Sequence, residues 1–324
     1  MKQNIAIVMG GYSSEVNISL TSGNVVYKHL NKEKYNPYRV HILKDKWVAL
    51  DDDNQEYPIN RSDFSFSLNG TSVIFDCVFN AIHGAPGENG TLLAYFNLIN
   101  LKHTSAPFYQ MALTFNKRDT LSVVKEYGIK TAVSVYLNKG DVVDLDAIIN
   151  KVGLPCFVKP NNAGSSYGIS KAHTKAEMLP ALEKAYKEDT EILIESFLDG
   201  PEVSVGVIHY KGETTVLPIT EIVTENDFFD YEAKYEGKSQ EITPARISDE
   251  EKIKVEEIAK KVYKILNMSG FSRSEYILVN GEPHFLEMNT VPGLTEESIL
   301  PQQAKVAGIS LEELFESAIE SAFV

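Results

Sequence analysis

The opening of the chain changes from a strand pattern to a helix pattern at a pair of glycines. Residues 4–9 are a short apolar run, and after Gly10-Gly11 apolar side chains recur at helical spacing. Residues 73–82 form a second apolar run, which leads through a glycine-rich loop, residues 83–90, into another helical segment. Strand, glycine turn and helix in this order predict an N-terminal open α/β domain on a parallel sheet.

Short strands and capped helices alternate through the remainder of the chain. Helix starts are predicted where Ser or Thr precedes Glu by three positions, as at Thr174, Ser248 and Ser310, because the two residues then cap each other's backbone. Residues 224–246 are polar with scattered aromatic side chains, and a long ordered loop is often a functional lid. The patterns predict an α/β (α+β) protein of about two domains, or three small ones.

Composition narrows the class of protein. The 324 residues are 43% hydrophobic and 23% charged, as in an ordinary globular protein. Acidic residues outnumber Lys and Arg by 45 to 31, a net charge of −14, so we expect no binding to nucleic acid or to an anionic membrane. Cys77 and Cys156 lack metal-ligand spacing, and no apolar stretch suits a signal peptide or a membrane span. We therefore expect a soluble, cytoplasmic protein.

Two strand patterns near the C-terminus are joined by Asn280-Gly281, which is a strong hairpin signal. A two-residue turn pairs Glu275 with Leu286 and leaves Glu287 on the other face, because side chains alternate between the faces of a sheet. A three-residue turn pairs Glu275 with Glu287 instead. The turn therefore decides whether the two carboxylates share a surface.

The register with a three-residue turn places two carboxylates, an amide and an arginine on one face, since Arg273 then lies opposite Asn289. Facing carboxylates repel unless a cation lies between them, and Mg²⁺ typically takes few protein carboxylates together with substrate phosphates. Glu275, Glu287 and Asn289 are therefore candidate metal ligands. The alternative is a solvated polar face of an edge hairpin.

A lysine and a glycine-serine loop form a candidate phosphate site. Lys159 ends a predicted strand, and the Gly and Ser residues of the loop at 161–168 let backbone N–H groups approach phosphate oxygens. The order of glycines and lysine differs from that of a P-loop. Lys117 is a second cation in a mostly neutral context, so both lysines are candidates for a triphosphate. The alternatives are an ordinary turn and solvated lysines.

A carboxylate pair flanks an apolar dipeptide farther along the chain. Glu195 and Glu202 can hold ribose hydroxyls while Phe197 and Leu198 pack against an adenine. The alternative is a charged strand end followed by a turn.

Two residues of the N-terminal part are candidates for substrate contact. Glu15 falls in the first turn of the predicted helix, where it can hold a substrate ammonium group or simply complement the helix dipole. His83, in its glycine loop, is either a turn residue or a substrate contact.

Together these segments resemble the D-alanine–D-alanine ligases of the ATP-grasp superfamily, in the family's order and over nearly the whole chain. The segments are Gly10-Gly11-x-Ser13-Ser14-Glu15, His83-Gly84-x-x-Gly87-Glu88-x-Gly90, Lys159-Pro160 with Gly164-Ser165-Ser166-x-Gly168, Asp230-Tyr231-Glu232-Ala233-Lys234-Tyr235, and Glu287-Met288-Asn289-Thr290-x-Pro292-Gly293-Leu294-Thr295.

The resemblance implies an ATP-grasp fold: an N-terminal α/β substrate domain at residues 1–110, a central subdomain at 111–205, and a C-terminal subdomain with lid and metal site at 206–324. It implies that ATP phosphorylates one D-alanine and that the amine of a second attacks the acyl phosphate, giving D-alanyl-D-alanine for peptidoglycan synthesis. It also implies Mg²⁺ or Mn²⁺, two ions, and a homodimer.

The resemblance further implies roles for single residues. The ATP-binding set is Lys117, Lys159, Ser166 and Lys234 at the phosphates, with Glu195, Phe197, Leu198 and Glu202 at the adenosine. The metal ligands are Glu275, Glu287 and Asn289. The substrate and catalytic set is Glu15 at the first ammonium group, His83, Arg273 and the Gly293 backbone at the oxyanion, Ser298 at the second carboxylate, and Glu15, Ser165 and Tyr235 as the group that holds the lid closed.

Four positions depart from the commoner family pattern, namely Ala163, Ser196, Glu275 and Glu297. Three other functions stay open: a D-alanine–D-lactate ligase, a phosphotransferase on the same scaffold, and a silent nucleotide-binding protein. Tyr235 argues against the first, because the family commonly has histidine there in depsipeptide formers. Arg273 beside metal ligands argues against the last, because simple binding needs no oxyanion arginine.

Overall fold

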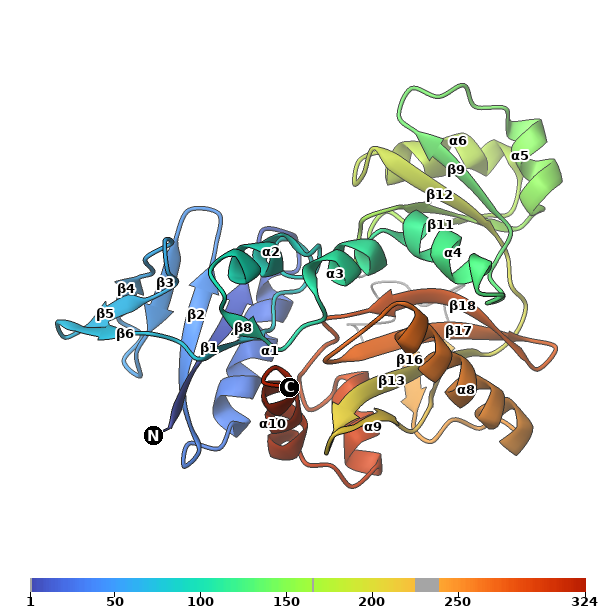
Figure 1. Cartoon of the computed structure of the whole chain (residues 1–324). Coiled ribbons are helices and arrows are strands. Elements are labelled where there is room, and N and C mark those ends of the chain that lie inside the picture. The colour runs from blue at the N-terminus through green and yellow to red at the C-terminus, as the bar shows by residue number, and fades with distance from the viewer. Residues whose placement is uncertain (1, 165, 225–238) are drawn as a thin grey trace.

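The computed structural model describes residues 2–164, 166–224 and 239–324, and its three larger sheets can be followed in Figure 1. The N-terminal sheet lies to the left, a smaller sheet stands at the upper right, and the C-terminal sheet lies below it. All three contribute to the candidate site.

The N-terminal sheet is parallel at its centre and antiparallel at one edge, in the order β4-β3-β2-β1-β7-β8. Its first strand is buried on both faces, which explains why the sequence there is a continuous apolar run. The predicted strand at 73–82 is shorter, since its first residue belongs to a separate hairpin, β5 with β6. The strands are β1 (Gln3–Gly10), β2 (Tyr35–Ile42), β3 (Trp47–Leu50), β4 (Glu56–Pro58), β5 (Phe66–Leu68), β6 (Thr71–Val73), β7 (Cys77–Asn80) and β8 (Lys102–His103). The helices are α1 (Val16–His29), α2 (Thr91–Leu98) and α3 (Phe108–Phe115).

The smaller sheet is antiparallel, in the order β11-β10-β12-β9, and two helices bury an apolar cluster against it. The capping box predicted at Thr174 is wrong: Thr174 is the N-cap, but its hydroxyl donates to Glu177 instead of accepting from the helix backbone. The elements are α4 (Lys117–Glu126), β9 (Ser134–Asn138), α5 (Leu145–Val152), β10 (Cys156–Pro160), β11 (Ser170–Ala172), α6 (Lys175–Ala185) and β12 (Glu191–Ser196).

The C-terminal sheet runs β16-β15-β13-β17-β18, with β14 paired to β13. The capping boxes predicted at Ser248 and Ser310 are confirmed. The strands are β13 (Glu202–Tyr210), β14 (Glu213–Val216), β15 (Thr220–Thr224), β16 (Ser239–Ile242), β17 (Ser272–Val279) and β18 (Glu282–Asn289). The helices are α8 (Asp249–Ile265), α9 (Ile299–Val306) and α10 (Leu311–Ser321).

The last helix returns to the beginning of the chain. Phe315 of α10 packs edge-on against Phe79 of β7, with ring centroids 5.7 Å apart, in one buried cluster with Ile5 and Ile7 of β1. Figure 1 shows α10 beside α1, under the N-terminal sheet. The first and last segments of the chain thus share a core, which fixes the N-terminal loops against the C-terminal sheet.

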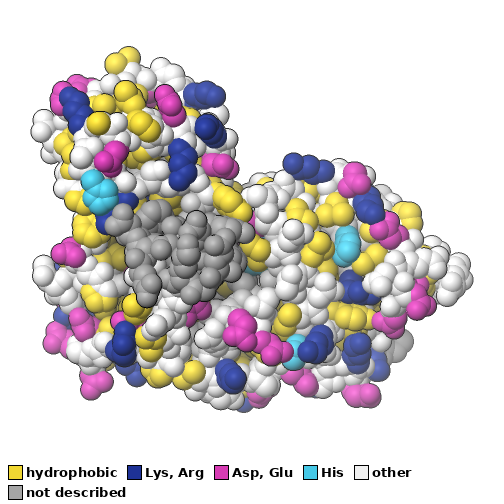
Figure 2. Space-filling model, turned by 180° about the vertical axis from the view of Figure 1, so that it is seen from behind, with side chains coloured by type: hydrophobic (Ala, Val, Ile, Leu, Met, Phe, Trp, Pro, Cys, Tyr) yellow, Lys and Arg dark blue, Asp and Glu magenta, His cyan; other side chains and the backbone are white. Residues whose placement is uncertain are grey.

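The surface carries mixed charge. Acidic and basic side chains are interspersed over the face in Figure 2. None of the helices in the described part of the chain is both long enough and apolar enough to cross a bilayer.

Candidate functional site

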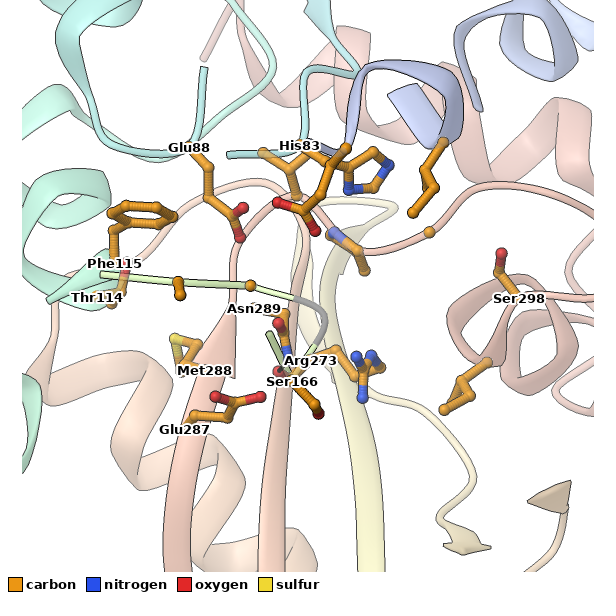
Figure 3. A pocket seen from close by; sticks show the side chains of 18 of the residues that line it. His83, Glu88, Thr114, Phe115, Ser166, Arg273, Glu287, Met288, Asn289 and Ser298 are labelled. Carbon is orange, nitrogen blue, oxygen red and sulfur yellow. Dashed lines mark hydrogen bonds between the residues drawn. The ribbon is translucent and has the colours of Figure 1, made fainter. Parts of the chain in front are cut away.

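Two cavities meet between the three sheets. One, here called the Arg273 cavity, has a volume of about 320 Å³, and the other, the Lys159 cavity, of about 450 Å³. Lys117, Ser166 and Glu287 line both, so the cavities adjoin at these residues. Figure 3 looks into the Arg273 cavity, where side chains from the N-terminal loops face those of the β17–β18 hairpin. A ligand with two unlike ends can therefore span them.

The β17–β18 hairpin pairs Glu275 with Glu287 and Arg273 with Asn289, as the second predicted register requires. The three-residue turn proposed for that register is wrong. The turn has two residues, since Val279 pairs with Glu282, and a β-bulge between Glu275 and Tyr276 shifts the register. A bulge adds one residue to one strand, which moves the later side chains to the other face. Two carboxylates and an amide thus share one surface.

Arg273 is fixed before any ligand binds. Its Nη1 donates to Ser204 Oγ at 2.8 Å and also to Glu275 Oε1. Burial alone would lower the pKa of Arg273, but the charge and the hydrogen bond of Glu275 outweigh it and raise the pKa. The guanidinium therefore stays charged in the cavity, where Figure 3 places it between Glu287 and Ser298.

Both candidate phosphate lysines are held by carboxylates. Lys159 Nζ lies 2.8 Å from Glu195 Oε2, and Lys117 Nζ lies 3.2 Å from Glu287 Oε2. Burial alone would lower the pKa of Lys159, but Glu195 outweighs it and the pKa is raised. Two cations at the junction of the cavities are suited to a polyanionic ligand.

Asn161 connects the two elements that carry the lysines, a role that its position in the loop at 161–168 does not reveal. Its Oδ1 accepts from the backbone N–H of Arg118 at 2.9 Å, and its Nδ2 donates to Glu191 Oε2 at 2.6 Å. Lys117 Nζ also donates to the carbonyl of Ala163, at 2.9 Å. The start of α4 is thereby fixed to the loop that follows β10.

Glu15 is nearly buried at the N-cap of α1, next to two tight glycine turns. A Cβ on Gly11 would lie 2.8 Å from Ile82 Cγ2, so this turn requires glycine, as its φ of 101° also does. A Cβ on Gly164 would lie 2.8 Å from both carboxylate oxygens of Glu15. The candidate phosphate loop therefore packs directly on the carboxylate of the N-terminal region.

The loop that carries His83 adds a second acid. Loss of solvent, with the negative charge of Glu15 next in effect, raises the pKa of Glu88 to about 7. Burial lowers the pKa of His83, so its ring is neutral at pH 7; its Nε2 lies 3.0 Å from Ser22 Oγ. Glu88 was quoted in a sequence motif without a role, and its glycine-rich surroundings were the only signal for it.

Ser298 is the N-cap of α9, and its hydroxyl lies 2.8 Å from Thr295 Oγ1. A Cβ on Gly293 would lie 2.6 Å from Ser298 Oγ, so the Gly293 backbone and the start of α9 are in close contact. Helix N-termini offer unpaired N–H groups and a partial positive charge to an anion. This wall of the cavity therefore suits a carboxylate.

The Lys159 cavity has an aromatic wall and an acidic rim. The rings of Phe157 and Phe197 lie 6.4 Å apart, and Leu198 and Glu202 line the same cavity. Glu195 Oε1 is buried with no hydrogen-bond partner among the described residues, although Oε2 is paired. An unsatisfied buried acceptor beside an aromatic ring fits a planar heterocycle that donates a hydrogen bond.

The donor set of the hairpin fits a divalent cation bound together with a ligand. No cluster of three or more His, Cys, Asp or Glu side chains with metal-binding geometry occurs among the described residues. Glu275, Glu287 and Asn289 supply two carboxylates and an amide, and Mg²⁺ commonly completes such a set with phosphate oxygens and water.

The structure brings the described members of the predicted site together. Each lines at least one cavity: Glu15, His83, Asn289, Arg273, Gly293 and Ser298 the Arg273 cavity; Lys159, Glu195, Phe197, Leu198, Glu202 and Glu275 the Lys159 cavity; Lys117, Ser166 and Glu287 both. Ser165, Lys234 and Tyr235 lie outside the described residues.

Comparison with known proteins identifies related sequences along the whole chain. The family described as D-ala D-ala ligase N-terminus matches residues 4–106, and the family described as D-ala D-ala ligase C-terminus matches residues 123–320. A D-alanine–D-alanine ligase of Flavobacterium johnsoniae is 68% identical over 318 residues, 98% of each chain. One of Christiangramia forsetii is 60% identical over 322 residues, 99% of each chain.

Solved structures of ligases also superpose on nearly the whole chain. The VanG D-Ala:D-Ser ligase of Enterococcus faecalis superposes with a TM-score of 0.86 at 30% identity, covering 99% of this chain and 100% of that one. The D-alanine–D-alanine ligase of Bacillus anthracis complexed with ATP superposes with a TM-score of 0.79 at 26% identity, covering 99% and 97%.

Proposed function

The chain belongs to the D-alanine–D-alanine ligase family, and we propose that its two adjoining cavities bind different substrates of the ligase reaction. The enzyme has the ATP-grasp fold and joins two D-alanine molecules at the expense of ATP, releasing ADP and phosphate. The dipeptide is a precursor of peptidoglycan. The Lys159 cavity takes the nucleotide and the Arg273 cavity takes the amino acids.

The adenosine lies in the Lys159 cavity, between Phe197, Leu198 and the carboxylates of Glu195 and Glu202. Oε1 of Glu195 supports this: it is buried, has no partner among the described residues, and could accept a hydrogen bond from the exocyclic amine of adenine. The triphosphate then points to the junction of the cavities, where Lys117, Lys159 and Ser166 contact it. Lys234 is assigned to the phosphates from the sequence resemblance alone.

Glu275, Glu287 and Asn289 would hold two ions of Mg²⁺ or Mn²⁺ against the phosphates. A bound divalent cation neutralises phosphate charge and orients the γ-phosphoryl group. The protein's own share is to keep the two carboxylates on one surface, which the bulge in the hairpin does.

The first D-alanine lies with its ammonium group near Glu15 and its carboxylate toward the γ-phosphate. One carboxylate oxygen attacks phosphorus, the bond to ADP breaks, and D-alanyl phosphate forms. His83 contributes a neutral ring beside this substrate. Closure of the lid by Glu15, Ser165 and Tyr235 would exclude water from the acyl phosphate.

The second D-alanine lies with its carboxylate at Ser298 and the N-terminus of α9. Its amine attacks the acyl carbonyl, negative charge develops on the carbonyl oxygen, and phosphate leaves as the peptide bond forms. Arg273 and the backbone N–H of Gly293 stabilise that oxygen. Arg273 is suited to this because its position and charge are set in advance by Ser204 and Glu275.

The wider organisation follows the same proposal. The N-terminal substrate domain is residues 1–110, the central subdomain 111–205 and the C-terminal subdomain 206–324. We place the enzyme in the cytoplasm, in keeping with a reaction that uses free amino acids and ATP, and we assign a homodimer from the sequence resemblance alone.

One assay tests the function: phosphate release and dipeptide formation in the presence of ATP, Mg²⁺ and D-alanine. The observation that carries the proposal is that Lys117 and Glu287 line both cavities and lie 3.2 Å apart. We expect D-alanyl-D-alanine and phosphate in equal amounts. Phosphate release that stays at background would rule out ligase activity, and phosphate release without dipeptide would favour a phosphotransferase.

D-Serine and D-lactate in place of the second D-alanine sharpen the assignment. A structural relative is a D-Ala:D-Ser ligase, but it is 30% identical, whereas the Flavobacterium D-alanine–D-alanine ligase is 68% identical. We therefore expect D-alanine to be the preferred acceptor. A mixed product with D-serine or D-lactate as the major species would contradict this.

A further inference from the structure

The side-chain amide of Gln303 joins three elements that surround the Arg273 cavity. Gln303 lies on α9 and is fully buried. Its Nε2 donates to the carbonyl of Ser204 at 2.8 Å and to Thr220 Oγ1 at 3.0 Å, and its Oε1 accepts from the N–H of Gly206 at 2.9 Å. Both donors and the acceptor are used, so α9, β13 and β15 are tied through one side chain.

The amide fills a gap in the sheet. β13 is paired by β15 up to Ser204 and by β14 from Val207 onward, so its edge changes neighbour between these residues. A buried backbone group left without a hydrogen-bond partner destabilises the folded state. Gln303 supplies partners for Ser204 and Gly206, in the place of a neighbouring strand.

The contact between helix and strand is also tight. A Cβ on Gly206 would lie 2.7 Å from Gln303 Oε1 and 2.5 Å from Leu300 Cδ1. The absence of a side chain at Gly206 therefore lets α9 approach β13 closely enough for the amide to reach the backbone. The position of α9 is set by hydrogen bonds and by close packing together.

This junction connects two groups of the site that are far apart in sequence. Ser298 is the N-cap of the helix that carries Gln303. Ser204, whose carbonyl accepts from Gln303, uses its hydroxyl to hold Arg273. Figure 3 shows Arg273 and Ser298 on neighbouring walls of the cavity. One buried amide thus sets the spacing between them.

We propose that Gln303 is a positioning residue for the second D-alanine. It holds the N-terminus of α9, and with it Ser298, at a fixed distance from Arg273, so that the acceptor carboxylate is bound while its amine faces the acyl carbonyl. The inference rests on the proposed function, which places the acceptor at Ser298. Gln303 acts on the second half of the reaction and not on formation of the acyl phosphate.

Hydroxylamine distinguishes formation of the acyl phosphate from its reaction with the second D-alanine. In excess, this small nucleophile competes with the second D-alanine for the acyl carbonyl of D-alanyl phosphate. A C–N bond forms, the C–O bond to phosphate breaks, nitrogen loses a proton to solvent, and D-alanine hydroxamate forms in place of the dipeptide. Hydroxamate and dipeptide are measured for the wild type and for Gln303→Met, which keeps the length of the side chain but removes its hydrogen bonds. Val262→Ala, in the core of α8, is the control for lost stability.

We expect Gln303→Met to form hydroxamate at the wild-type rate while the KM for the acceptor D-alanine rises about tenfold, because small misplacements of a bound reactant are costly. Val262→Ala should melt at a lower temperature with both rates unchanged. Gln303→Glu keeps the acceptor for Gly206 and regains a donor when protonated. Its acceptor KM should therefore fall toward the wild-type value as pH is lowered, which Gln303→Met cannot reproduce.

An unchanged acceptor KM in Gln303→Met would overturn the inference, as would an equal loss of hydroxamate and dipeptide. If Gln303→Met does not fold, the pH dependence of Gln303→Glu decides, and an acceptor KM that does not change with pH counts against the inference. A wild-type protein that forms neither product would instead overturn the proposed function. The two failures are therefore distinguishable.

Discussion

The two cavities hold their functional groups in different ways. In the Lys159 cavity the charges are paired with one another: Lys159 with Glu195 at 2.8 Å, and Lys117 with Glu287 at 3.2 Å. In the Arg273 cavity Arg273 is also paired with a carboxylate, that of Glu275, but it donates in addition to the neutral hydroxyl of Ser204 at 2.8 Å. The two lysines therefore depend mainly on their charged partners, whereas Arg273 depends also on a neutral residue of β13.

The difference indicates which ligand reorganises the site. On the proposed function, we expect Lys117 to exchange Glu287 for phosphate oxygens when a triphosphate binds, and Glu287 would then be available to a cation. The amino-acid side needs no such exchange, because its groups already face the cavity. We expect substitutions on the nucleotide side to act mainly through charge and those on the amino-acid side mainly through position.

The largest effect is expected from Glu287→Gln, which breaks the charge balance at the junction of the cavities. The variant should fold but lose turnover by about a thousandfold, because one carboxylate serves both Lys117 and the metal. Measuring kcat and the melting temperature separates the two. Glu282→Gln, on the same strand but paired with Lys130 and Lys254 at the surface, is the matched control and should keep wild-type activity. Normal activity in Glu287→Gln would mean that the metal lies elsewhere.

Glu195→Gln tests how much the paired charges of the Lys159 cavity contribute to the free energy of unfolding. It leaves Lys159 buried without its charged partner, and breaking a buried ion pair in this way costs about 3 kcal/mol. Chemical denaturation of the ligand-free protein measures the loss. Saturating ATP with Mg²⁺ should restore part of it, because the phosphates then pair with the lysine. A variant as stable as the wild type would show that the pair contributes nothing.

Glu88 makes the stability of the fold depend on pH. Its pKa is about 7 in the folded protein against an ordinary 4.5. The folded state therefore binds the proton more tightly than the unfolded chain, and stability falls as pH rises through this window. Between pH 5 and pH 7 we expect the wild type to lose about 2 kcal/mol relative to Glu88→Gln. Parallel stability curves for the two proteins would contradict this.

The smallest effect is expected from Gly164→Ala, where the two sides touch. The added Cβ would lie 2.8 Å from both oxygens of Glu15, so the carboxylate must shift. We expect the KM for the first D-alanine to rise about tenfold while the KM for ATP stays unchanged. Initial rates at varied D-alanine and varied ATP measure both. An effect confined to ATP would mean that this loop acts on the nucleotide alone.

Much of the architecture could be predicted from local patterns. The buried strand β1 and the boxes at Ser248 and Ser310 are confirmed, because apolar runs and capping residues act over a few positions. Each of the two hairpin registers left open by the sequence was half right: the turn has two residues, as in the first, and the partners are those of the second. A β-bulge depends on packing across the sheet, and the residue types near Asn280-Gly281 do not predict it.

The candidate site was predicted as a set of residues but not as a network. Side-chain types and family motifs pointed to Lys117 and Glu287, yet their contact joins positions far apart in sequence. Glu88, Asn161 and Gln303 were missed as supporting residues, because an amide or an acid acquires such a role only when the fold buries it beside unsatisfied partners.

The most direct test is a crystal structure with a non-hydrolysable ATP analogue and Mg²⁺. We expect the phosphates at the junction of the cavities, with the Nζ atoms of Lys117 and Lys159 in hydrogen-bond contact and the cation on Glu287 and Asn289. Lys117 should have left the carboxylate that it contacts at 3.2 Å without ligand. A nucleotide bound elsewhere, with these side chains turned away from it, would contradict the account.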